Sequence, residues 1–199
     1  MKASKFLSII LHPIFIPITT IYISILKLPN TLIIQSQIGS VLIILSLFTV
    51  LLPLINVFFY ILIGKVKNIN LNHLEERVLV LVSTVAWLVI GYIILKDLLF
   101  YSPVLKKIYL GTIYIQIISC IISVKWKISL HMLAMGGAIG TFIALNFIYG
   151  GMLKVVIYGV LASGFLGYAR LEELAHDKAQ VYSGFTLGFF IITVSILYL

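Results

Sequence analysis

The stretch Val78-Leu-Val-Leu-Val-Ser-Thr-Val-Ala-Trp-Leu-Val-Ile-Gly-Tyr-Ile-Ile-Leu95 holds 18 consecutive residues without a charge. As a helix it would be about 27 Å long, close to the roughly 30 Å thickness of the hydrocarbon core of a bilayer. An apolar run of this length predicts a membrane-spanning helix. This segment therefore sets the fold class.

Working outward from it, similar apolar runs recur along the chain between charged or polar interruptions. They predict spans at residues 6–26, 40–63, 78–95, 108–124, 130–149, 153–169 and 181–198. The stretch 29–40 fits either a loop or an extension of the second span. Glycine pairs at helical spacing in the later spans, such as Gly136 and Gly140 or Gly184 and Gly188, indicate close helix packing. We expect an all-α, polytopic membrane helix bundle of about six to seven transmembrane helices, forming a single domain over residues 1–199.

The composition agrees with this fold, because 62% of the residues are hydrophobic and only 10% are charged, against about 25% charged in soluble domains. The first apolar run is too long for a cleaved signal and is predicted as a span. The net charge of +8 comes from basic residues between apolar segments, which favours lipid headgroups or an anionic ligand as partners and not nucleic acid. We expect a multi-pass integral protein of the cell membrane.

Alternating spans bring three polar segments to the same side of the bilayer: residues 70–77, 127–131 and 169–180. That side takes the N-terminus, five of the six acidic residues, and His73, His131 and His176, with His12 near the same end of the first span. Ionisable groups near a bilayer are costly, so their clustering predicts a functional site. The alternative is that these segments are ordinary solvated loops.

These segments contain, in chain order, Arg77, Ser129, His131, Arg170 and His176. This order, together with the five residues between Arg170 and His176, resembles the type 2 phosphatidic acid phosphatase superfamily of membrane lipid-phosphate phosphatases. The resemblance covers a core from about residue 70 to 199. It implies that His176 is the nucleophile that takes the phosphoryl group and that His131 protonates the leaving alkoxide. Arg77, Lys127, Ser129 and Arg170 would hold the phosphate oxygens, and no metal or other cofactor is implied.

Six positions depart from the pattern of the superfamily: Asn70, Val78, Ile128, Leu130, Ala169 and Gln180. Two of them bear directly on the chemistry. Asn70 stands in place of a lysine, and Gln180 stands in place of the aspartate that orients the nucleophilic histidine. A glutamine can orient the imidazole of His176 but brings no charge. If residues 170–180 are helical, Glu172 lies one turn before His176 and could supply the missing carboxylate, with Glu173 in reserve. The alternative is that both glutamates are solvated, or that one pairs with Arg170.

The leading function is therefore hydrolysis of a phosphate monoester or pyrophosphate of an amphiphilic lipid, with lipid phosphates and membrane lipids as partners. The alternative is an inactive relative that binds an anionic lipid or a membrane partner. A small transporter is a weaker reading, because no ionisable residue lies in the middle of a span. The excess of Lys and Arg on the motif side favours a cytoplasmic site, whereas the resemblance implies a site that faces outward. Either way, Arg77, His131, Arg170 and His176 are predicted to line one polar pocket at a single membrane interface.

Overall fold

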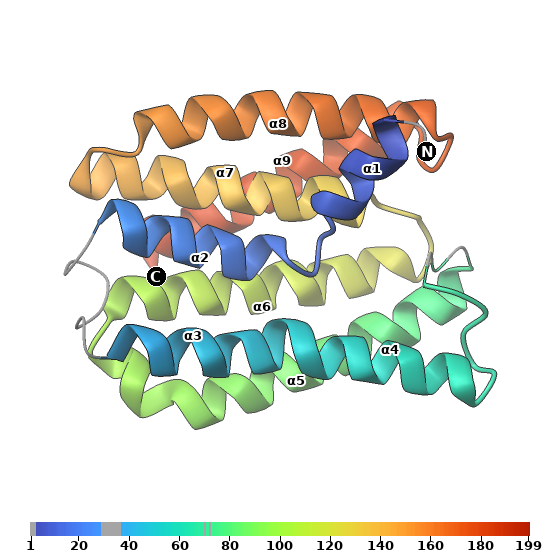
Figure 1. Ribbon diagram of the computed structural model, residues 1–199, viewed down its shortest axis with the longest axis horizontal. Helices are drawn as coiled ribbons and strands as arrows, with labels where there is room; N and C mark the ends of the chain where they lie inside the picture. The colour runs from blue at the N-terminus through green and yellow to red at the C-terminus, as the bar shows by residue number, and fades with distance from the viewer. Residues whose placement is uncertain (1–2, 29–36, 70, 72) are drawn as a thin grey trace.

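The computed structural model describes residues 3–28, 37–69, 71 and 73–199, and every regular element in these ranges is a helix (Figure 1). The predicted all-α bundle is confirmed. The elements are α1 (Ala3–Ile10), α2 (Ile16–Lys27), α3 (Ile38–Ser46), the π-helical segment η2 (Leu47–Leu51), α4 (Leu52–Leu62), α5 (Leu74–Phe100), α6 (Pro103–Ser123), α7 (Leu130–Tyr149), α8 (Leu153–Glu172) and α9 (Lys178–Tyr198).

Within the described ranges, six helices are long and apolar enough to cross a membrane. They are the continuous helix α3–η2–α4, spanning Ile38–Leu62, and helices α5 to α9. These correspond to the predicted spans from residue 40 onward, with ends that differ by a few residues. The chain is therefore a multi-pass integral membrane protein. Of the ambiguous stretch 29–40, residues 29–36 lie outside the described ranges and Ile38 already belongs to α3.

The single span predicted for residues 6–26 is wrong, because the structure divides it into α1 and α2. Residues 11–15 form turns between the two helices. Pro13 falls in this break, where its missing N–H removes a hydrogen bond that a continuous helix would need. The 12 residues of α2 extend only about 18 Å, too short to cross a bilayer alone.

Helix α7 is the most buried helix and packs closely against α9. A Cβ atom added to Gly136 would lie 2.0 Å from the carbonyl oxygen of Phe185, and one added to Gly188 would lie 2.0 Å from that of Leu133. The glycines let the two backbones touch, as their spacing in the sequence indicates. This packing fixes the N-terminal ends of α7 and α9 side by side.

The connections after α4, α6 and α8 all lie at one end of the bundle, on the right in Figure 1, and α1 lies at the same end. Each connection is separated from the next by two antiparallel helices, so the chain returns to this end each time. The three polar segments of the sequence therefore reach a common surface.

Candidate functional site

A cavity of about 810 Å³ opens at this end of the bundle and continues between the helices. Its charged lining residues, among those described, are Lys5, Arg77, Lys127, Arg170 and Glu173, and three histidines, His12, His131 and His176, join them. With neutral histidines, four cations face one carboxylate, so the mouth of the cavity carries a net positive charge. Deeper in the bundle the lining is largely apolar and includes Leu88, Ile108 and Ile192.

Arg77 lies in the first turn of α5 and is almost completely buried, with 3% of its surface exposed. Its Nε donates to the Ser123 hydroxyl at 3.1 Å, and its Nη2 donates to the carbonyl of Ile128. The guanidinium thus connects α5 to the end of α6 and to the segment that leads into α7. It lines the cavity from a fixed position.

Ser129 is the residue before α7, and its fully buried hydroxyl has no hydrogen-bond partner in the described part of the chain. Its backbone N–H donates to the carbonyl of Gln180 at 3.3 Å, which joins the starts of α7 and α9. Ser129 does not itself line the cavity. It supports the wall from which His131 projects.

His131, in the first turn of α7, contacts the N-terminal helix. Its Nε2 lies 3.1 Å from the backbone carbonyl of Ser8, which as an acceptor requires the proton to be on Nε2. The ring also packs edge-on against His12, with 5.5 Å between centroids. The other ring nitrogen, Nδ1, makes no hydrogen bond to any of the described residues.

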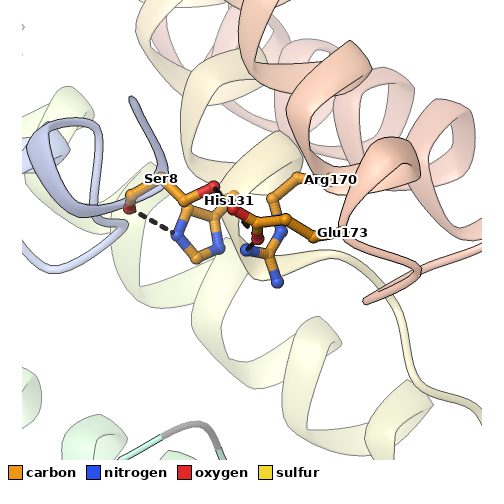
Figure 2. Close-up of polar contacts among 4 residues, drawn as sticks. All are labelled: Ser8, His131, Arg170 and Glu173. Atoms are coloured by element: carbon orange, nitrogen blue, oxygen red, sulfur yellow. Dashed lines mark hydrogen bonds and ion pairs between the residues drawn. The ribbon is translucent and has the colours of Figure 1, made fainter. Parts of the chain in front are cut away.

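Arg170, Glu173 and Ser8 form a connected polar cluster beside His131 (Figure 2). Arg170 Nη1 donates to Glu173 Oε2 at 2.8 Å, and the Ser8 hydroxyl lies 3.2 and 3.3 Å from the two carboxylate oxygens of Glu173. The Nε of Arg170 is buried and has no partner within the described residues. The guanidinium is therefore only partly satisfied by the protein.

His176 lies in the turn between α8 and α9. Its Nδ1 is 2.8 Å from Gln180 Oε1. Because an amide oxygen only accepts, Nδ1 carries the proton and the lone pair of the neutral ring is on Nε2. Burial, together with Arg170, Arg77 and Lys127 nearby, lowers the pKa of His176 to about 4, against the raising effect of the Gln180 hydrogen bond. The imidazole is therefore neutral at pH 7.

Lys127 lines the cavity from the connection between α6 and α7. Burial lowers the pKa of its ammonium group, and the charges of Arg77 and Arg170 lower it further. Three cations thus lie close enough to repel one another. An anion bound between them would relieve this repulsion.

The expected position of Glu172 at the imidazole is not found. Residues 170–180 are not one helix, because α8 ends at Glu172, α9 begins at Lys178, and Leu174 between them has a positive φ of 50°. Glu172 is exposed and does not line the cavity. Glu173 lines the cavity instead and pairs with Arg170. This is the alternative interpretation, in which one of the two glutamates pairs with Arg170. Asn70 lies outside the described residues.

The sequence reasoning missed the contribution of α1. Ser4, Lys5, Ser8 and His12 all line the cavity, yet they precede the segments that carry the motifs. The signal was the spacing of Ser4, Ser8 and His12 at four-residue intervals, which places polar groups on one face of a helix in an otherwise apolar stretch.

Comparison of the chain with family models, curated proteins and solved structures finds no match. Within the described ranges, no group of three or more His, Cys, Asp or Glu side chains could hold a metal ion.

Proposed function

We propose that this membrane protein binds the phosphate group of an amphiphilic lipid in the cavity and hydrolyses it with His176 as the nucleophile. The observation that carries the proposal is the convergence of five side chains from three distant segments, Arg77, Lys127, His131, Arg170 and His176, on one cavity. The resemblance of the same residues to the type 2 phosphatidic acid phosphatase superfamily supports it.

The form of the cavity suits an amphiphile. Its mouth carries the cations, which attract phosphate, and arginine can bind phosphate oxygens in a bidentate fork. Its interior is lined by Leu88, Ile108 and Ile192, which lie within spanning helices, and it suits an apolar chain. A ligand with both parts would place its phosphate at the bilayer surface and its chain between the helices.

The proposed reaction uses the lone pair on His176 Nε2. This nitrogen attacks phosphorus, the bond to the lipid oxygen breaks, and the leaving alkoxide takes a proton from Nδ1 of a His131 imidazolium or from water. A water molecule then hydrolyses the phosphohistidine and releases phosphate. Arg77, Lys127 and Arg170 neutralise the charge on the transferred group, which is the main demand of phosphoryl transfer. A pKa of about 4 keeps His176 unprotonated and nucleophilic at neutral pH.

Binding without turnover is the second candidate, and two contacts favour it. The partner of His176 is the neutral amide of Gln180, which cannot stabilise an imidazolium as a carboxylate would. The proton on His131 Nε2 is held by the Ser8 carbonyl, so His131 could protonate a leaving group only from Nδ1, after becoming an imidazolium. Gln180→Asp should separate the two candidates, because it should raise turnover only in an enzyme.

The test is to purify the full chain in detergent and measure its thermal stability against vanadate, then phosphate release from a panel of lipid phosphates and pyrophosphates. Vanadate should raise the melting temperature by mass action. Arg170→Ala should abolish this rise, Arg170→Lys should restore part of it, and the exposed Lys178→Ala should leave it unchanged as a matched loss of one charge.

An unchanged melting temperature over a wide vanadate range would contradict a phosphate site. If vanadate binds but neither the wild type nor Gln180→Asp releases phosphate from any lipid, the protein binds the anion without turnover. Phosphate release that His176→Ala removes would establish the hydrolase.

A further inference from the structure

Helix α1 turns its polar face toward the bundle and its apolar face away from it. Ser4 and Ser8 are buried, with 6% and 7% of their surface exposed, whereas Phe6, Ile9 and Ile10 are each more than half exposed. A surface helix of a soluble protein has the opposite arrangement. In a membrane, this arrangement puts apolar side chains against lipid and hydroxyl groups against the cavity.

The inner face of α1 is already joined to the site. Ser8 contacts Glu173 through its hydroxyl and His131 through its carbonyl (Figure 2). Ser4 lies one helical turn earlier on the same face and lines the same cavity. Helix α1 is therefore a wall of the cavity in its own right.

The Ser4 hydroxyl is buried and has no hydrogen-bond partner in the described part of the chain. The other buried hydroxyls near the start of the chain behave differently, since Thr20 and Ser24 each donate to the carbonyl four residues earlier, at 2.7 and 2.8 Å. Buried polar groups are nearly always paired. An unpaired hydroxyl that faces a cavity is a group for a ligand to satisfy.

A second unpaired group lines the same cavity. Of the four buried side-chain atoms without a partner among the described residues, the Ser4 hydroxyl and the Nε of Arg170 belong to residues that line it. The other two, the Ser129 hydroxyl and the Gln37 carbonyl oxygen, belong to residues that do not line it. Both groups at the cavity can donate a hydrogen bond, and the mouth of the cavity has a net positive charge, so they suit an anion with several acceptor oxygens.

From these observations we infer that α1 is a ligand-binding wall of the phosphate site, in which the Ser4 hydroxyl donates directly to a phosphate oxygen. This inference rests on the proposed function, because it names a further contact for the same phosphate group. It adds a residue outside the three motif segments and outside their resemblance to any family. Lys5, which follows Ser4 and also lines the cavity, adds positive charge to this wall.

The test compares Ser4→Ala with Phe6→Ala, a matched truncation on the opposite, lipid-facing side of the same helix. The dissociation constants of vanadate, inorganic phosphate and a short-chain phosphatidic acid are measured for the full chain in detergent. Ser4→Ala should weaken all three by about 10- to 100-fold, the loss expected for one hydrogen bond to a charged acceptor. Phe6→Ala should leave them within twofold of the wild type.

The melting temperature without ligand separates a binding role from a structural one. Because the Ser4 hydroxyl has no partner in the described ranges, its removal should leave that temperature unchanged or raise it. A lower melting temperature for Ser4→Ala, with dissociation constants equal to those of the wild type, would show a structural role and overturn the inference.

The three ligands also distinguish the inference from the function beneath it. If the wild type binds the anions and Arg170→Ala does not, while Ser4→Ala binds like the wild type, only the inference fails. If the wild type binds none of them, the proposed function and the inference both fail. Weaker binding of the lipid alone would mean that Ser4 contacts another part of the lipid, which would also overturn the phosphate contact.

Discussion

The two sides of the cavity are built in different ways. On one side, α7 and α9 meet backbone to backbone at Gly136 and Gly188, and the Ser129 N–H bonds to the Gln180 carbonyl where the two helices begin. On the other side, α1 meets the site through the polar contacts of Ser8 with Glu173 and His131. The first side leaves no space for adjustment, whereas the second depends on a few hydrogen bonds.

This difference matches the demands on each side. Of the residues proposed for chemistry, His131 lies in the first turn of α7. His176 lies in the turn just before α9, and its partner Gln180 lies in the first turn of α9. They are therefore next to the start of the closely packed pair of helices. Phosphoryl transfer depends on such positioning. The α1 side lines the cavity with hydroxyl groups and one positive charge, and in the proposed function these groups bind the phosphate and do not react. The cavity thus combines a rigid wall with an adaptable one.

The strongest way to break the rigid wall is Gly188→Ala. The new Cβ would lie 2.0 Å from the carbonyl of Leu133, and a backbone atom cannot move aside as a side chain can. We expect a loss of about 3 kcal/mol or more in the free energy of unfolding, at the upper end for overpacking. Gly164→Ala, which meets nothing within 4 Å on α8, is the matched control and should be neutral or slightly stabilising. Thermal unfolding in detergent measures both, and equal stabilities would contradict the comparison.

The second change tests one cation on each side: Arg77, which is buried and bonded to the segment that enters α7, and Lys5, which is exposed on α1. Arg77→Met removes two hydrogen bonds and leaves the Ile128 carbonyl without this donor, at a cost of about 1–3 kcal/mol in stability. Lys5→Met on α1 removes an exposed charge and should change stability by less than about 0.5 kcal/mol. Both should weaken vanadate binding. A Lys5→Met protein less stable than Arg77→Met would reverse the assignment of rigid and adaptable walls.

The third change is one of pH. The pKa of His176 is about 4 in the folded chain, below the usual 6.5, so the unfolded chain binds more protons between these values and stability falls as the pH is lowered from about 6.5 to 4. Above pH 6.5 this contribution is fully present. His176→Gln should reduce the slope of melting temperature against pH within this window. An unchanged slope would show that His176 is not the buried neutral group described above.

The sequence predicted most of the bundle because hydropathy follows directly from residue type, and six spans agree closely. It missed the break in the first span because an apolar run that includes Pro13 scores like any other, although proline disrupts the backbone. The common end for Arg77, His131 and His176 was predictable, since two spans separate the segments. The choice between Glu172 and Glu173 was not, because it depends on the positive φ of Leu174, a conformation that a leucine does not signal.

The smallest effect follows from that correction. Glu172→Gln should leave anion binding, stability and any phosphate release within twofold of the wild type, because the side chain is exposed and lies outside the cavity. Glu173→Gln should alter anion binding, because it removes the charge that pairs with Arg170. A large loss of turnover in Glu172→Gln would restore this residue as the partner of His176.

The π-helical segment η2 has a consequence for how this chain tolerates changes in length. A π-turn holds one residue more than an α-turn, and Pro53, just after η2, has no N–H to offer the carbonyl of Thr49 four residues earlier. Deleting one residue from Leu47–Leu51 would restore the α-helix and rotate everything before it by about 100°. Val41 and Leu45, now fully buried, would turn out of the core, and Thr49 would leave the lining of the cavity. The extra residue thus keeps two parts of one span in register, the earlier part facing its neighbours and the later part facing the cavity.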